Sequence, residues 1–227
     1  MSWLPRLLSW LGSYSSEIMP GRIHPKDPHL LSNVLIGDRF CNDSVIALTV
    51  WKHSLVFSCN GFTVFDPDGK IVFKVDNYYS DPNDHALLMD DAGNPLLTMQ
   101  RKRFSLHHEW EAFIGGKMDG QKPLFVVKRR FLLPTRVLAQ IYVGSINKKS
   151  HPDYQIEGSY AKTSCTVYNS SRNVVVEMRR KQVTSDITLG GDVFSVIVQP
   201  GYDQAFVMGF IVMLHHIMAP NYSRSMY

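Results

Sequence analysis

The chain has 227 residues, of which 44% are hydrophobic and 19% are charged, and its formal net charge is +4. These proportions are typical of a folded globular protein and exclude a collagen-like, low-complexity or mainly disordered chain. Three widely spaced cysteines, Cys41, Cys59 and Cys165, favour neither a disulfide framework nor a zinc module, so we expect a reducing, cytoplasmic environment.

The N-terminal residues form no processing signal that the sequence supports. The apolar start, MSWLPRLLSWLG, is interrupted by Pro5 and is followed by no cleavage site. We expect residues 1–23 to be a tail that is flexible or packs on the domain; an interfacial anchor is the alternative, because a helix would place Trp3, Leu7 and Trp10 on one face. A single domain over residues 24–220 and a C-terminal tail over 221–227 are predicted to follow.

From near Leu30 the chain is a series of short runs with strand periodicity, separated by turn formers. Residues 61–75 predict a hairpin, because Asp66, Pro67, Asp68 and Gly69 separate two alternating runs. A second turn is predicted over 90–95, and Val174, Val176 and Met178 are expected to share one face of a later strand. About a dozen strands are expected, a number typical of sandwiches and barrels, and the later ones cover residues 110–114, 124–128, 136–143, 164–168, 172–180 and 193–198.

The segment 202–218 predicts a helix that begins with Asp203 as a cap and ends before Pro220. Residues 205–214 contain no polar side chain, so this helix has no face suited to water. Its length of about 24 Å is short of the roughly 30 Å of a bilayer core, so we expect no transmembrane span. We predict instead a mainly β fold, a closed antiparallel barrel around a central helix whose apolar residues are Phe206, Met208, Gly209, Phe210, Ile211, Met213 and Leu214.

Histidines and cysteines supply no recognisable catalytic or metal site. His107 and His108 are expected to point to opposite faces of a strand, and His215 and His216 to occupy the last helical turn, where the helix dipole favours their protonated forms. Cys165 lies in an apolar strand and is interpreted as a buried, inert thiol. We therefore expect a protein that is not an enzyme, with no catalytic residue, metal or cofactor.

Positive charge is concentrated in residues 97–150, which contain eleven Lys or Arg and three Asp or Glu. Basic clusters end three predicted strands. If these strand ends meet at one rim of the barrel, they form an anion site suited to phosphate groups, whereas a solvated, lysine-protected sheet edge is the plainer alternative. The candidate lipid-binding residues are Arg101, Lys102, Arg103, Lys128, Arg129, Arg130, Arg179, Arg180 and Lys181.

Several segments, in this order and spacing, resemble the plant LURP-one-related family: LHHEWEAF at 106–113, GSY at 158–160, SCTVY at 164–168 and FSV at 194–196 before the apolar helix. The resemblance implies a tubby-like fold, distant kinship with phospholipid scramblases and an association with plant defence. The sequence departs from the family where His108 replaces a common Asp and where His215 and His216 replace an acidic pair. A scramblase activity is the less favoured alternative, because no acidic calcium loop precedes the helix.

The function that we predict is a regulatory or binding module that contacts phosphoinositides or another membrane surface through the basic rim. A protein-interaction scaffold and a membrane-tethered transcription regulator of the tubby type remain as alternatives. Anionic phospholipid headgroups and proteins are the expected partners, and nucleic acid is not expected, because no recognition helix or aromatic platform is present. We expect a monomer located in the cytoplasm, at the plasma membrane or in the nucleus.

Overall fold

The computed structural model describes residues 35–52, 61–77, 85–102, 105, 108–116, 120–130, 136–144, 151–184, 187–188 and 192–218. The predicted tails, and the two ends of the predicted domain at residues 24 and 220, lie outside these ranges. Arg103 and His107 also lie outside the described residues.

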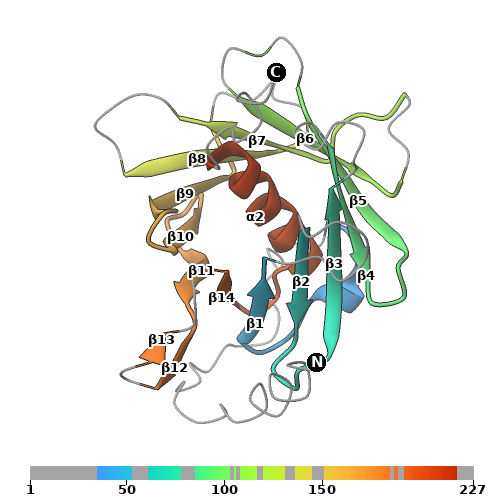
Figure 1. Cartoon of the computed structure of the whole chain (residues 1–227). Helices are drawn as coiled ribbons and strands as arrows, with labels where there is room; N and C mark the ends of the chain where they lie inside the picture. Colours follow the sequence, from blue (N-terminus) through green and yellow to red (C-terminus); the bar gives the residue numbers. More distant parts are fainter. Residues whose placement is uncertain are drawn as a thin grey trace, which may run out of the picture.

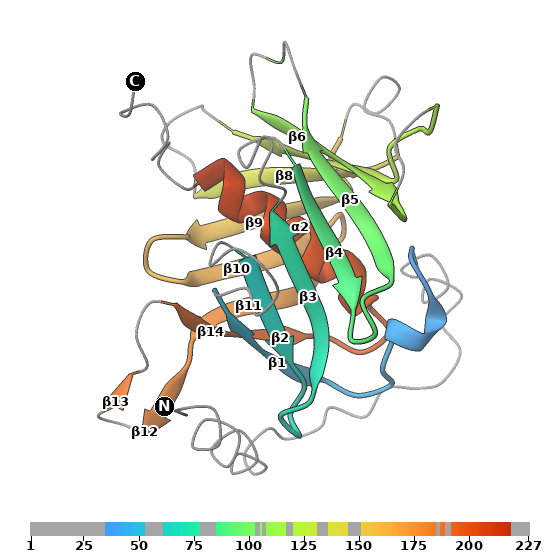
Figure 2. The same ribbon diagram turned by 45° about the vertical axis from the view of Figure 1, so that its right-hand side comes forward.

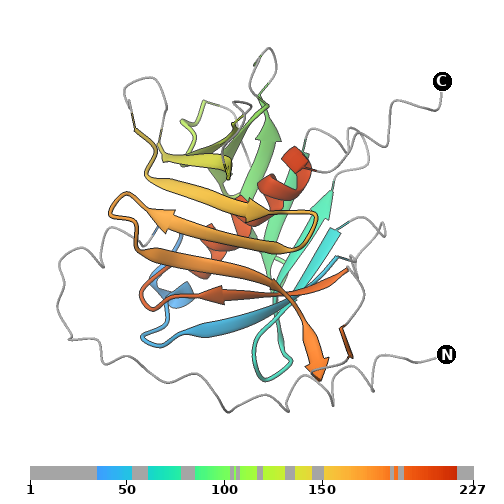
Figure 3. The same cartoon turned by 90° about the vertical axis from the view of Figure 1, so that its left-hand side faces the viewer.

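Twelve strands of the described chain form the closed antiparallel barrel that the sequence predicts (Figure 1). Consecutive strands from β1 through β11 pair with one another, and β14 closes the ring by pairing with both β11 and β1. Figure 3 shows β9, β10, β11 and β14 side by side, in yellow to red-orange, with the blue β1 next to β14. The barrel strands are β1 Ile46–Trp51, β2 Gly61–Phe65, β3 Ile71–Asn77, β4 His85–Asp90, β5 Pro95–Arg101, β6 Glu109–Ile114, β7 Phe125–Arg129, β8 Val137–Val143, β9 Tyr154–Ser159, β10 Ser164–Asn169, β11 Val174–Arg180 and β14 Val193–Val198.

Alternating burial follows the strand periodicity. In β14, Phe194, Val196 and Val198 are buried, whereas the residues between them are partly exposed. The prediction for β11 was wrong at one position, because Val174 is 37% exposed while Val175 and Val176 are both buried. The β10–β11 pairing shifts register between Val167 and Tyr168, and a bulge of this kind breaks the alternation of faces.

Five elements of the described chain lie outside the residue ranges that the sequence predicted. Two are the barrel strands β1 and β9. The other three are a 3-10 helix, η2 (Asp38–Phe40), which precedes β1, and the short strands β12 (Gln182–Thr184) and β13 (Ile187–Thr188), which pair with each other outside the barrel. These three are too short to produce a periodic pattern in the sequence.

The helix α2 (Gln204–Met218) lies inside the barrel, as predicted. All residues from Gln204 to Leu214 are buried, so the strands take the place of solvent around the apolar segment. Gly209 lies where an added Cβ would be 2.7 Å from Leu97 Cδ1 and 3.0 Å from Phe125 Cζ, which explains its role in close packing. Of the helices that the structure describes, none has the length and apolar character needed to cross a bilayer.

Asp203 caps α2 and also attaches the segment before β1 to it. Its Oδ1 accepts hydrogen bonds from the backbone N–H groups of Ala205 and Phe206 at 2.9 and 3.1 Å, which confirms the predicted cap. Its Oδ2 accepts three more from the consecutive N–H groups of residues 35–37, at 3.2, 2.7 and 3.1 Å. One fully buried carboxylate therefore fixes both the start of the helix and the entry of the chain into the barrel.

Candidate functional site

The three predicted basic clusters lie at the same end of the barrel. Neighbouring strands of an antiparallel barrel alternate in direction, so β1, β3, β5, β7, β9 and β11 all end at one rim. The helix α2 ends there too, because Arg129, the last residue of β7, donates from Nη1 to the Ile217 carbonyl oxygen at 3.5 Å. We call this end of the barrel the mouth; α2 runs toward it from lower right to upper left in Figure 2.

Strand pairing brings two of these clusters together and separates the third. Arg101 pairs with Trp110, which pairs with Val127 on the next strand, and Glu109 pairs with Lys128. The first two clusters therefore share the ends of β5 and β7, with only β6 between them. The cluster at the end of β11 is separated from β7 by three strands, β8, β9 and β10, and lies across the mouth.

Strand alternation divides the basic residues into inward-facing and outward-facing sets. Residues two positions apart in a strand share a face, and Val50, Met99, Val127 and Met178 belong to the buried core. The side chains that follow these four residues by two positions are therefore on the same inner face, toward α2. We call these residues the mouth cations: Lys52, Arg101, Arg129 and Arg180.

Several outward-facing basic residues are paired with carboxylates. Lys102 Nζ lies 3.4 Å from both Glu109 Oε2 and Glu111 Oε1, and Lys128 Nζ lies 3.2 Å from Glu109 Oε1. Burial lowers the pKa of Lys102, but the two carboxylates outweigh this effect and hold the pKa above its ordinary value. Arg179 is paired with Glu177 in the same way. These residues carry little net charge that a ligand can use.

The remaining candidates are arranged differently. Lys181 Nζ donates to Thr49 Oγ1 at 2.8 Å, and burial lowers the pKa of this lysine. Arg130 is exposed and follows Lys128 on the outer face by alternation. Arg180 is exposed, and its Nε donates to the Lys162 carbonyl oxygen at 3.2 Å.

The last turn of α2 places two histidines beneath the mouth cations. The His215 Nδ1 atom lies 2.5 Å from the Tyr160 hydroxyl, and the His216 ring stacks on Trp110 with centroids 4.6 Å apart. Burial, and then the nearby Lys52, lowers the pKa of His215 to about 4. Burial, and then His215, lowers the pKa of His216 to about 3. The prediction that the helix dipole favours protonated histidines was therefore wrong, because burial in an apolar barrel outweighs it.

His216 also carries an unusual polar atom. Its Nε2 is buried and has no hydrogen-bond partner among the described residues. Most buried polar groups in folded proteins are hydrogen-bonded, so an exception at the end of an otherwise apolar helix suggests a missing partner. Sequence reasoning did not find this atom, because neither its burial nor its lack of a partner is visible in the chain.

Lys52 and His108 complete the description of the mouth. The Lys52 ammonium lies over the Tyr160 and Phe194 rings, 5.5 and 5.6 Å from their centroids. His108 has a φ of 46° and precedes β6, so the prediction that it lies in a strand was wrong. Burial, followed by the charges of Arg101 and Arg129, lowers its pKa.

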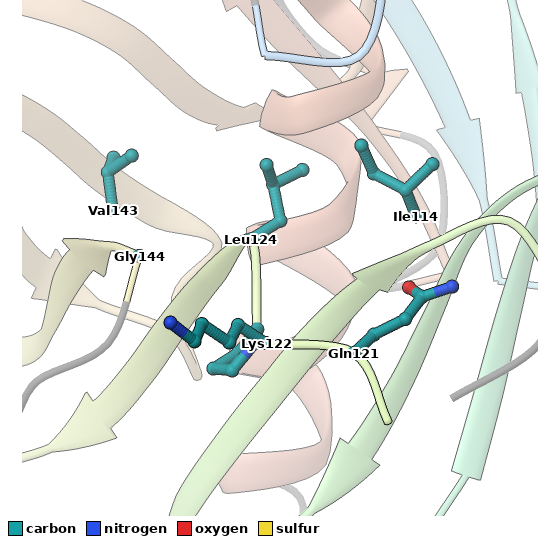
Figure 4. Close-up of a pocket in the computed structure, with 7 residues that line it drawn as sticks. Ile114, Gln121, Lys122, Leu124, Val143 and Gly144 are labelled. Carbon is teal, nitrogen blue, oxygen red and sulfur yellow. The ribbon is translucent and has the colours of Figure 1, made fainter. Parts of the chain in front are cut away.

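The opposite end of the barrel carries an open groove with a volume of about 480 Å³. Ile114, which is 51% exposed, lies along it with Leu124 and Val143, and Lys122 supplies a cation (Figure 4). No motif pointed to this groove. It is lined by Ile114, Gln121, Lys122, Pro123, Leu124, Val143 and Gly144.

Two potential nucleophiles of the described chain are held in their protonated forms. Burial raises the pKa of the Cys165 thiol to about 11 and also raises the pKa of the Tyr160 hydroxyl, so both groups stay protonated at neutral pH. Within the described ranges, no three His, Cys, Asp or Glu side chains gather to hold a metal ion. Guanidinium and ammonium groups beside neutral imidazoles are suited to bind an anion.

Known proteins with similar sequences and folds identify the family. The profile described as LURP-one-related (LOR) matches residues 46–215. Protein LURP-one-related 5 of Arabidopsis thaliana is 41% identical over 191 residues, covering 81% of this chain and 89% of that protein. Protein LURP-one-related 12 of the same plant is 39% identical over 174 residues, covering 75% and 77% of the two chains.

A solved structure agrees with this assignment. The X-ray structure of a protein from Arabidopsis thaliana superimposes with a TM-score of 0.64 and 28% sequence identity, over 82% of this chain and 99% of that one. The resemblance that the sequence motifs indicated is confirmed. The matched profile and the two relatives show that this chain belongs to the LURP-one-related family.

Proposed function

We propose that this protein is a regulatory binding module, not an enzyme, that attaches to membrane surfaces by binding anionic phospholipid headgroups at the mouth of its barrel. The observation that carries the proposal is that basic clusters 101–102, 128–130 and 179–181, far apart in the chain, end strands at one rim. Phosphoinositides are the favoured class, because Arg and Lys side chains gathered in one place bind phosphate groups strongly.

Two competing roles account for part of this charge but not for all of it. Arg129 binds the last turn of α2, as a cation near a helix C-terminus commonly does. Lys102 and Lys128 are paired with Glu109. Arg101 and Arg180 form no ion pair with any described carboxylate, so their charge supports a role in binding a partner.

A vesicle co-sedimentation experiment tests the proposal. Neutral phosphatidylcholine vesicles are compared with vesicles that also contain phosphatidylserine or a phosphoinositide. Each basic side chain near an anionic surface contributes about 1 kcal/mol, so Arg101→Glu with Arg180→Glu should weaken binding by more than about tenfold.

The control is Lys70→Glu with Lys122→Glu, which makes the same change in net charge at exposed positions of the opposite end. These substitutions should leave vesicle binding within about twofold of wild type, because they lie well beyond a Debye length of about 8 to 10 Å from a membrane at the mouth. Equal losses in the two double variants, or no binding by the wild-type protein, would contradict the proposal.

A further inference from the structure

We infer that the bound headgroup enters the mouth and is held by the inward-facing mouth cations at the last turn of α2, and that its chemical class is a multiply phosphorylated polyol. This inference rests on the proposed function and deepens it. The inference differs from the proposed function in placing a specific binding site inside the mouth, rather than nonspecific attraction by the positive charge around the rim.

The first step is the difference between the two faces of the same strand ends. Lys102, Lys128 and Arg179 face outward and are each bound to a carboxylate. Among the described residues, Arg101 and Arg180, which face inward, are bound to none. Arg101 and Arg180 therefore keep their charge available to an anion on the inside of the mouth, and the outward-facing Arg130 of the described chain is likewise bound to no carboxylate.

The second step is the unpartnered atom below these side chains. His216 stacks on Trp110, which pairs with Arg101 across the β5–β6 ladder. Its Nε2 is buried and lacks a partner among the described residues, and the imidazole is neutral near pH 7. A neutral imidazole donates or accepts a hydrogen bond at Nε2 according to its tautomer. A phosphate oxygen or a hydroxyl group of a ligand can therefore supply the missing hydrogen-bond partner.

The third step is the spread of positive charge around the helix end. Arg101 and Arg129 lie at the ends of β5 and β7, whereas Lys52 and Arg180 lie at the ends of β1 and β11, on the other side of the ring. The Arg180 side chain is exposed at the rim, where its Nε donates to the Lys162 carbonyl oxygen. A single phosphate contacts only one of these sides. A ring that carries two or more phosphates, with hydroxyl groups between them, contacts both sides and offers a partner to His216.

Three groups of the described mouth oppose an anion, and the third of them is Asp76 near the end of β3, whose Oδ1, like His216 Nε2, is buried without a hydrogen-bond partner. The carbonyl groups at the C-terminal end of a helix carry partial negative charge, and Asp192 lies near Lys52. Arg129 offsets the first effect, because it donates directly to the Ile217 carbonyl oxygen. Asp192 is exposed, so solvent screens the second effect.

The test compares two double variants that remove the same charge from the same end of the barrel. Arg101→Gln with Arg180→Gln removes inward-facing cations, and Arg130→Gln with Arg179→Gln removes outward-facing ones. Binding is measured with soluble inositol trisphosphate by calorimetry and with phosphoinositide vesicles by co-sedimentation. The inward pair should lose at least about tenfold in affinity for both probes, and the outward pair less than about threefold, since only the inward pair makes charged hydrogen bonds to the ligand.

A third variant tests the histidine. His216→Phe keeps an aromatic ring against Trp110 and removes Nε2, so it should fold and bind inositol trisphosphate about five- to tenfold more weakly, the effect of one lost hydrogen bond to a charged group. Thermal melting checks that each variant is folded. If the inward pair unfolds, the adjacent single variants Arg180→Gln and Arg179→Gln carry the same comparison.

The outcomes separate this inference from the proposed function. Equal losses in the inward and outward pairs, with wild-type vesicle binding intact, would overturn the inference and leave membrane binding in place. Binding of soluble inositol trisphosphate that depends on Arg101 and Arg180, without vesicle binding, would support the mouth site, identify a soluble ligand and overturn membrane binding. Failure of wild type to bind either probe would overturn both.

Discussion

Asp203 shows how much structure one side chain determines. Its carboxylate accepts hydrogen bonds from five backbone N–H groups of the described chain, two in α2 and three in residues 35–37. The side chain is fully buried, and hydrogen bonds to a charged acceptor are about twice as strong as neutral ones. The residue therefore links the helix to the segment that leads into β1.

We expect Asp203→Asn to lower the free energy of unfolding by about 3 kcal/mol or more. The new amide group would present N–H donors to the three N–H groups of residues 35–37 and leave them unsatisfied. Urea denaturation measures the loss. Asp66→Asn is the matched control, because Asp66 accepts from Lys70 N at 2.8 Å in an exposed turn, and it should cost less than about 1 kcal/mol. Similar midpoints for the two variants would show that Asp203 has no such role.

His215 and His216 show that burial can outweigh a helix dipole at the level of single residues. Both rings are neutral in the folded protein, with pKa values of about 4 and about 3, below the ordinary value of 6.5. The unfolded chain binds protons at these residues once the pH falls below about 6.5, whereas the folded chain does not. Their contribution to stability is complete above pH 6.5 and is lost progressively as the pH falls toward the folded values.

The wild-type protein should therefore lose stability between pH 6.5 and pH 5, and His216→Phe should reduce that loss by up to about 2 kcal/mol. Phenylalanine has no proton to bind in the unfolded state, and its ring can still stack on Trp110. Urea denaturation at a series of pH values measures the difference. The same pH dependence in both proteins would mean that His216 is protonated in the fold.

At the scale of secondary structure, α2 depends on close contact with the strands around it. Glycine disfavours a helix by about 1 kcal/mol relative to alanine, so Gly209 is a poor choice for the helix taken alone. Leu97 and Phe125 are both fully buried, and a Cβ at position 209 would lie 2.7 and 3.0 Å from their side-chain atoms. The packing of the barrel, rather than helix propensity, requires the glycine.

We expect Gly209→Ala to be destabilising by about 1 to 2 kcal/mol, because the cost of overpacking exceeds the gain in helix propensity. Leu97→Ala alone should cost about 2 to 5 kcal/mol through the cavity that it leaves. The double variant should cost less than the sum of the two, since the new methyl group occupies the space that Leu97 vacates. Denaturation midpoints of the four proteins give the coupling, and strict additivity would argue against this contact.

At the scale of the whole molecule, the two ends of the barrel differ in the charge of their described residues. The described part of the mouth carries more cations, on the ends of β1, β5, β7 and β11 and at the start of β8, than the carboxylates Asp76, Glu109 and Asp192 that also lie there. The turns at the opposite end carry more aspartates than cations, which there are Arg39, Lys70, Lys122 and Arg172. A molecule of this kind approaches an anionic surface mouth first. The mouth cations and their basic neighbours are Lys52, Arg101, Lys102, Lys128, Arg129, Arg130, Arg136, Arg179, Arg180 and Lys181, and the aspartates are Asp38, Asp43, Asp66, Asp68, Asp90, Asp91 and Asp153.

The sequence predicted this separation only in part. Residues 97–150 are the basic segment of the chain, yet Lys122 within it lies at the opposite end, and Lys52 and Arg180 outside it lie at the mouth. Position along the chain does not determine the end of the barrel at which a residue lies. The direction of the strand determines the end of the barrel at which a residue lies. That direction depends on how many turns between antiparallel strands precede it in the chain.

The amino-acid sequence by itself determined ten of the twelve barrel strands, the two hairpin turns, the buried helix with its Asp203 cap and the closed barrel, because these depend on local periodicity, turn residues and an apolar segment that must avoid water. Only the tertiary structure decided which basic residues face the helix, which are neutralised by Glu109, and why His215 and His216 are neutral. Those properties depend on register, burial and neighbours distant in the chain, and small shifts in any of them change electrostatic energies inside the barrel strongly.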